Sequence, residues 1–130
     1  MRTRLLRQRH APDIVDETID WLREYEFVDD EAFAEFWTEN RVLFRPRGQR
    51  LLRYELARRG VTQETARLAV EGVDEEDGAY RAAIKRATRL PHADEALFRR
   101  RLSEFLTRRG FDHEVISRVV ERVWREAQVA

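Results

Sequence analysis

Apolar residues recur along the chain at intervals of three, four and seven positions, which is the spacing of one face of an α-helix. Ile14, Leu22 and Tyr25 form one such stripe. Phe33, Trp37 and Phe44 form another. No segment alternates between apolar and polar residues as a half-buried strand would. The spacing predicts helices near residues 2–10, 13–25, 30–44, 47–59, 63–72, 75–89, 95–109 and 113–126.

Short polar residues and glycines mark the predicted helix ends. The side-chain oxygen of an N-cap residue accepts a hydrogen bond from a free backbone amide of the first turn. The predicted N-caps are Asp30, Thr62, Asp94 and Asp112. Gly60 and Gly110 each follow two arginines. This pattern indicates a helix C-terminus, because glycine adopts the left-handed conformation easily and cations suit the negative end of the helix dipole.

Two stretches of the chain repeat each other fifty residues apart. Leu52, Leu56, Arg58, Arg59, Gly60, Val61 and Glu64 recur as Leu102, Leu106, Arg108, Arg109, Gly110, Phe111 and Glu114. A weaker copy, shifted by fifty-one positions, runs through Leu5, Ile14, Val15 and Ile19. The repeat predicts three related three-helix units, at residues 1–45, 46–92 and 93–130. The first unit is shortened at its start, and the last lacks its third helix.

Repeated helical units bury their apolar faces against their neighbours and stack into long bodies. We therefore predict an all-α fold in which tandem three-helix repeats form an elongated, curved helical array. Such an array offers a long concave surface, which suits binding to an extended partner.

Residues with the spacing of a catalytic site are missing from the sequence, so we expect neither an enzyme nor a bound cofactor. There is no cysteine, the five glycines are scattered, and the three histidines lie far apart. The acidic run at 29–31 has two interpretations. It could hold a divalent metal ion, but acidic residues are also favoured in the first turn of a helix by the helix dipole, and we favour that second explanation.

Apolar runs in the sequence are short. The longest are only a few residues, far below the twenty or so that span a bilayer, and the basic segment 1–9 lacks the apolar stretch of a signal peptide. We expect a cytoplasmic protein that does not enter a membrane, and a monomer.

Charge is distributed unevenly although the chain is neutral, with 25 basic and 25 acidic residues. Residues 13–39 hold eleven acids and one arginine, whereas residues 41–59 hold seven arginines and one acid. A second basic stretch, residues 99–109, holds five arginines against Glu104. Arg47, Arg50 and Arg53 follow one another at helical spacing, and such a patch favours phosphates or an acidic protein surface.

Two simpler interpretations compete with a binding role. Arginines on helix faces are commonly only solvated, and the acidic segment could neutralise many of them. Trp21, Phe33, Phe36 and Trp37 lie mostly in the apolar stripes, so we expect these rings to pack in a core rather than to stack on nucleic-acid bases.

Three segments of the sequence resemble the signature of the RecX family, the bacterial regulators of the RecA recombinase. The first is Phe27-Val-Asp-Asp-Glu-Ala-Phe-Ala, followed by Asn40-Arg. The second is Phe44-Arg-Pro-Arg-Gly-Gln-Arg-Leu-Leu-Arg-Tyr-Glu-Leu, continuing to Gly60. The third is Phe105-Leu-Thr-Arg-Arg-Gly-Phe with Val115-Ile. The resemblance covers nearly the whole chain.

The resemblance implies a function. RecX proteins are tandem three-helix repeats that lie in the helical groove of the RecA–DNA filament and suppress ATP hydrolysis and strand exchange. The partner-binding residues carried over to this chain are Arg41, Arg45, Arg47, Arg50, Arg53 and Arg58. Single-stranded DNA is a second candidate partner. Two alternatives stay open: a helical protein that binds single- or double-stranded DNA directly, and a helical adaptor for an unrelated acidic partner.

Overall fold

The computed structural model describes residues 29–129, and these residues fold into six helices without a strand. The helices are α3 (Asp30–Phe44), α4 (Gln49–Arg58), α5 (Gln63–Val70), α6 (Glu75–Ala87), α7 (Glu95–Arg108) and α8 (His113–Val129). The all-α prediction is confirmed, and these six helices lie within a few residues of their predicted bounds. The helices predicted at 2–10 and 13–25, and the weak repeat copy there, lie outside the described residues.

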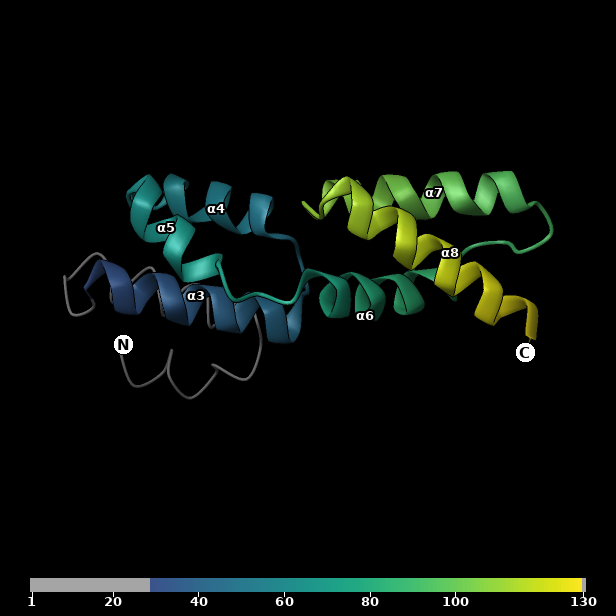
Figure 1. Ribbon diagram of the computed structural model, residues 1–130, viewed down its shortest axis with the longest axis horizontal. Coiled ribbons are helices and arrows are strands. Elements are labelled where there is room, and N and C mark those ends of the chain that lie inside the picture. Colours follow the sequence, from purple (N-terminus) through teal and green to yellow (C-terminus); the bar gives the residue numbers. More distant parts are fainter. Residues whose placement is uncertain (1–28, 130) are drawn as a thin grey trace, which may run out of the picture.

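The helices form two three-helix units that lie end to end along the long axis of the molecule (Figure 1). In the first unit α5 packs against both α3 and α4, and in the second α8 packs against both α6 and α7. α4 and α7 occupy one layer of the elongated body, and α3 and α6 occupy another (Figure 1). The tandem, elongated arrangement predicted from the repeat is therefore present.

The boundary between the units differs from the predicted divisions at 45/46 and 92/93. The loop near residue 73, between α5 and α6, separates the two units instead. The repeat indicated the period of fifty but not the position where a unit begins, because its matching residues all come from the second and third helices of each unit and the loop between them. The helix that precedes them, α3 or α6, packs onto those two helices and completes the unit.

Equivalent positions of the repeat have equivalent places in the two cores. Leu52 and Leu56 are fully buried in the first unit, as are Leu102 and Leu106 in the second. Gly60 has φ +85° and Gly110 has φ +83°, which confirms both predicted left-handed helix ends. In each case the next residue, Val61 or Phe111, donates its backbone amide back to the preceding helix and buries its side chain.

Side-chain oxygens cap the helix starts as the sequence indicated, with one displacement. Thr62 and Asp94 accept from backbone amides in the first turns of α5 and α7. The Asp112 carboxylate accepts from the Glu114 amide at 3.1 Å. At α3 the cap is Asp29 rather than Asp30, since Asp29 Oδ1 accepts from the Ala32 amide at 2.8 Å.

The two units meet where the loop before α4 touches the loop after α7. The Gly48 amide donates to the Arg109 carbonyl oxygen at 2.8 Å. A Cβ atom on Gly48 would lie 2.1 Å from the Gly110 carbonyl oxygen, and one on Gly110 would lie 2.4 Å from the Leu51 Cβ. Only glycine fits at either position, so these two residues set how closely the units approach.

Glu75, the first residue of α6, forms hydrogen bonds to both units at this junction. One carboxylate oxygen accepts from the Gln49 amide at 2.9 Å, and the other accepts from the Asp112 amide at 3.3 Å. The carboxylate thus lies at the N-terminal ends of α4 and α8, where a negative charge is favoured.

Changing Glu75 to alanine is expected to lower the free energy of unfolding by about 1–3 kcal/mol, because two backbone amides lose a charged acceptor. The neighbouring Glu76 is the matched control. Its ion pair with Arg118 is about half exposed, so Glu76→Ala should cost about 1 kcal/mol or less. Urea unfolding followed by circular dichroism compares the two variants, and equal costs would contradict the role given to Glu75.

Candidate binding surface

The structure divides the six arginines predicted to bind a partner into inner and outer groups. Arg41 belongs to the inner group: it is only 2% exposed, and its guanidinium carbon lies 4.4 Å from the centre of the Trp37 ring. Burial, with a smaller contribution from Arg47, lowers the pKa of Arg41 to about 10. The side chain therefore stays cationic at neutral pH, but it serves the packing of the first unit rather than an outward contact.

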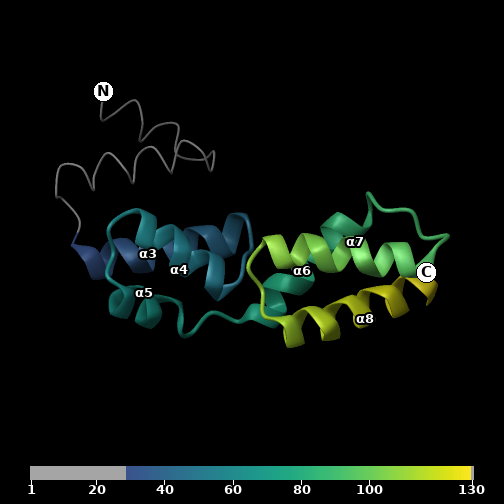
Figure 2. The same ribbon diagram turned by 90° about the horizontal axis from the view of Figure 1, so that it is seen from above.

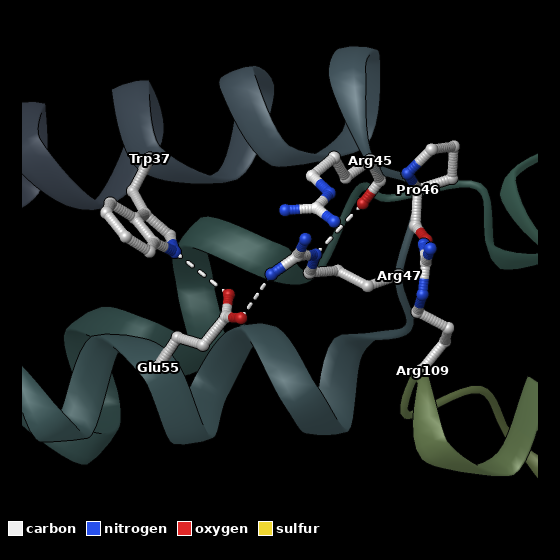
Figure 3. A network of polar contacts seen from close by, with 6 residues as sticks. All are labelled: Trp37, Arg45, Pro46, Arg47, Glu55 and Arg109. Carbon is white, nitrogen blue, oxygen red and sulfur yellow. Dashed lines mark hydrogen bonds and ion pairs between the residues drawn. The ribbon is translucent and has the colours of Figure 1, made fainter. Parts of the chain in front are cut away.

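Arg47 also faces inward (Figure 3). Its side chain is 12% exposed and forms an ion pair with Glu55, and its Nε donates to the Arg45 carbonyl oxygen at 2.9 Å. The other Glu55 carboxylate oxygen accepts from Trp37 Nε1 at 3.1 Å. These contacts connect α3, the loop at residues 45–48 and α4, so Arg47 holds the loop that forms the junction.

The remaining four arginines are the outer group. Arg45, Arg50 and Arg58 are exposed and Arg53 is partly exposed. Leu52 and Leu56 turn to the core, so residues 50, 53, 54, 57 and 58 form the opposite face of α4. Tyr54 is 57% exposed on that face, and Arg58 donates to its hydroxyl at 3.2 Å. We call this surface the α4 face; it carries three arginines beside one aromatic ring.

The second basic stretch, on α7, divides in the same way. Arg100, Arg101 and Arg108 are exposed. Arg99, in contrast, pairs with Glu95 and Glu121, both at 2.8 Å. The α4 face continues toward α7, because Arg50 Nη2 donates to the Thr107 carbonyl oxygen at 3.0 Å.

A basic hollow at the junction of the units was not anticipated from the sequence. Its volume is about 380 Å³. It is lined by Leu43, Phe44, Arg45, Pro46, Arg81, Ala82, Lys85, Arg86, Arg89, Phe105 and Arg109. We call it the junction cleft. A signal was present in the sequence, since Arg81, Lys85 and Arg89 are spaced four residues apart; the first two lie in α6 and Arg89 in the turn that follows it. The predicted unit boundary at 45/46 placed Arg45 in another unit than α6, which obscured how close the two come.

The prediction that four aromatic rings pack in a core is wrong for one of them. Phe33 and Trp37 are buried as expected, but Phe36 is 53% exposed, and Trp21 lies outside the described residues. Phe44, at the end of the same apolar stripe, is 49% exposed. The apolar stripe of α3 is wider than the face that α4 and α5 cover. Phe44, at the end of α3, lines the junction cleft instead.

Two further findings concern metal ions and membranes. Within 29–129 no three histidine, aspartate or glutamate side chains gather as a metal ion would require. The acidic residues at 29–31 form the cap and first turn of α3. No helix in the same range combines the length and apolar character needed to cross a membrane.

Comparison with family models assigns both units. The model of the second three-helix domain of RecX matches residues 29–70, and the model of the third matches residues 74–120. The first range spans α3–α5, and the second spans α6, α7 and the first half of α8.

Relatives and a solved structure agree with these matches. The regulatory protein RecX of Chlorobium limicola is 32% identical over 94% of this chain and 77% of its own length. The regulatory protein RecX of Thermobifida fusca is 34% identical over 91% of this chain and 66% of its own length. The crystal structure of RecX from Lactobacillus salivarius superposes with a TM-score of 0.67 at 19% identity, covering 85% of this chain and 74% of that one. This last likeness concerns the fold. The sequence matches and the two assigned domains show that the chain belongs to the RecX family of regulatory proteins.

Proposed function

We propose that this protein binds in the groove of the RecA–DNA filament and inhibits the recombinase and ATPase activities of RecA, and thereby modulates DNA repair and recombination. The observation that carries the proposal is the match of both three-helix units to consecutive RecX domains. The end-to-end body supports it, since an elongated protein can contact several subunits of a polymer (Figures 1 and 2). The proposed place of action is the cytoplasm, and the proposed free form is a monomer.

The α4 face, together with the exposed α7 arginines, is the proposed contact surface. Arg50, Arg53 and Arg58 project from α4, and Arg45 lies at the edge of the junction. Guanidinium groups form paired hydrogen bonds with carboxylates and phosphates, so the surface suits acidic protein side chains or the DNA backbone. Arg41 and Arg47 are left out of this surface, because their guanidinium groups already serve internal contacts.

The direct test is a titration of the protein into RecA bound to single-stranded DNA, with ATP hydrolysis as the readout. We expect hydrolysis to fall as the protein is added. Unchanged hydrolysis at a several-fold excess of the protein over RecA would contradict the proposal.

Reversing charge on the α4 face should weaken inhibition without unfolding the chain. In the Arg53→Glu/Arg58→Glu variant two outward cations become anions, and we expect at least about a tenfold increase in the concentration that halves RecA ATPase activity, since like charges then oppose each other at the interface. Circular dichroism should show unchanged helicity.

The matched control is Arg67→Glu/Arg125→Glu, which changes the net charge equally at two exposed positions on α5 and α8. Arg67 forms an exposed ion pair with Glu64, and such a pair contributes little to stability. Equal loss of inhibition in both variants would mean that net charge, rather than the α4 face, governs binding.

Direct binding to DNA is a second candidate function. The observation that favours it is the exposed Tyr54 ring among arginines, a combination that can stack on a base while pairing with phosphates. Binding to single-stranded DNA measured without RecA at several salt concentrations separates the two. Strong affinity that falls steeply with salt would favour direct binding, because phosphate contacts release counterions.

A further inference from the structure

The junction cleft gathers six cationic side chains with no acidic residue in its lining. They come from three parts of the chain: Arg45 lies in the loop after α3, Arg109 lies at the end of α7, and the other four lie in α6 and the turn that follows it. Like charges brought together repel each other, so the cluster is held against an electrostatic cost that a bound anion would relieve.

Four of these cations can contact a ligand, because only two of the six side chains are held by hydrogen bonds or ion pairs within residues 29–129. Arg81 is committed to Asp77 and to the Val42 carbonyl oxygen, and Arg109 donates to the Pro46 carbonyl oxygen at 2.8 Å. Among the described residues Arg45, Lys85 and Arg89 have no ion pair. These three and Arg86 can therefore turn toward a ligand.

Arg86 and Arg109 are positioned by one ring. Their guanidinium carbons lie 5.3 Å and 4.9 Å from the centre of the Phe105 ring. The Arg86 Nε atom is buried and has no hydrogen-bond partner in the protein. A buried donor without an acceptor is unfavourable, so the Arg86 side chain gains a hydrogen bond if it shifts and places Nε against a ligand oxygen. Burial lowers the pKa of Arg109, and the nearby cations Arg47 and Arg45 lower it further.

The rim of the cleft is apolar and exposed. Leu43 is 66% exposed and Phe44 is 49% exposed, and both line the same hollow as the cations. An exposed ring beside guanidinium groups is an arrangement on which a nucleobase stacks. The volume of about 380 Å³ falls at the small end of ligand pockets, which suits one nucleotide unit but not a helix of a partner protein.

We infer that the junction cleft binds the phosphate of a nucleotide, with Arg45, Lys85, Arg86 and Arg89 around the phosphate and Phe44 against the base. The nucleotide is either free or part of a single strand. Because Arg45 belongs to the first unit and the α6 residues to the second, an occupied cleft links the two units. This site differs from the α4 face and does not depend on contact with RecA.

Calorimetric titration of the full chain at low salt, without RecA, tests the inference with three probes: inorganic pyrophosphate, thymidine triphosphate and a ten-residue oligothymidylate. The test variant is Lys85→Gln/Arg89→Gln, which changes two exposed side chains. We expect it to weaken every probe that binds the native protein by at least about fivefold, since it removes two phosphate contacts.

The control variant Arg67→Gln/Arg125→Gln removes two exposed cations of α5 and α8 that line neither the cleft nor the proposed RecA contact surface. It should bind the probes within about twofold of the native protein if the cleft holds them. Equal weakening in the two variants, or no binding of any probe, would overturn the inference. Binding of thymidine triphosphate identifies a free nucleotide as sufficient, whereas binding of the oligothymidylate alone identifies the strand; either result supports the site.

Phe44→Ala separates the aromatic rim from the cations. We expect it to weaken the two thymidine probes and leave the affinity for pyrophosphate unchanged, because pyrophosphate has no base. If thymidine triphosphate and pyrophosphate lose affinity equally, Phe44 shapes the cleft without contacting a base, and the nucleotide assignment is rejected.

Discussion

Gly110→Ala is expected to lower the free energy of unfolding by about 2–5 kcal/mol, which combines two costs. The residue has φ +83°, and placing a side chain in the left-handed region costs about 1–2 kcal/mol. The new Cβ would also lie 2.4 Å from the Leu51 Cβ and 2.6 Å from the Leu51 backbone nitrogen. Backbone atoms cannot rotate away as a flexible side chain can, so relieving this overlap adds about 1–3 kcal/mol.

The internal repeat supplies the control for this prediction. Gly60 occupies the equivalent position of the first unit with φ +85°, but no atom lies within 4 Å of a Cβ built there. Gly60→Ala should therefore cost only the conformational term of about 1–2 kcal/mol. Chemical denaturation followed by circular dichroism measures both variants. Equal costs would mean that the units do not meet closely at Gly110 in solution.

Substitutions at the two glycines should also differ in their effect on RecA inhibition. Gly60 only ends α4, whereas Gly110 ends α7 and receives the first turn of α4 from the other unit. An alanine at 110 should thus change the relative placement of the α4 face and the exposed α7 arginines. RecA inhibition is expected to fall more for Gly110→Ala than for Gly60→Ala at temperatures where both variants are folded.

Local patterns predicted the helices well because those patterns depend on neighbouring residues. Apolar spacing located α3 to α8, and the arginine–glycine pairs located two helix ends with positive φ. Both signals come from the preferences of a few consecutive residues.

The faces of the helices were harder to predict because they depend on distant residues. Phe36 and Phe33 belong to the same apolar stretch, yet only Phe33 lies on the side that the rest of the unit covers. Arg41 and Arg47 belong to the same arginine-rich segment as Arg50, yet they are held by Trp37 and Glu55. A count of charges along the sequence cannot separate arginines that pack inside from those that face outward.

The junction depends on pairs of residues far apart in the chain. Gly48 meets Gly110, and Glu75 binds the amides of Gln49 and Asp112. In neither case does the sequence around these residues indicate the contact. The junction cleft was missed because its lining combines the Arg45 loop, α6 and the end of α7, which lie far apart in the chain.

Trp37→Ala is expected to lower the free energy of unfolding by about 3–5 kcal/mol, the range for removing a large buried ring. The residue is 2% exposed. The guanidinium carbons of Arg41 and Arg59 lie 4.4 Å and 3.9 Å from its ring centre, so the variant also removes two cation–π contacts. Arg41 would remain in a desolvated place without the ring that favours its charge.

Phe36→Ala on the same helix is the control. Its ring is 53% exposed, so the expected cost is about 0.5 kcal/mol or less. Urea unfolding should be followed by circular dichroism, because removal of Trp37 alters fluorescence directly. Similar costs for the two variants would show that α3 turns a different face to the core.

The effect of Trp37→Ala should extend beyond stability to the junction, through Glu55 and Arg47. Trp37 Nε1 and Arg47 both bind the Glu55 carboxylate, and Arg47 holds the loop that carries Gly48 to the second unit (Figure 3). Trp37→Phe keeps most of the ring but loses the donor to Glu55, so it should retain more stability than Trp37→Ala while loosening the loop. Hydrogen exchange at the Gly48 amide, which donates to Arg109, measures that loosening. Faster exchange in Trp37→Phe than in Phe36→Ala is the expected result, and unchanged exchange would mean that the loop is held without the Trp37–Glu55–Arg47 contacts.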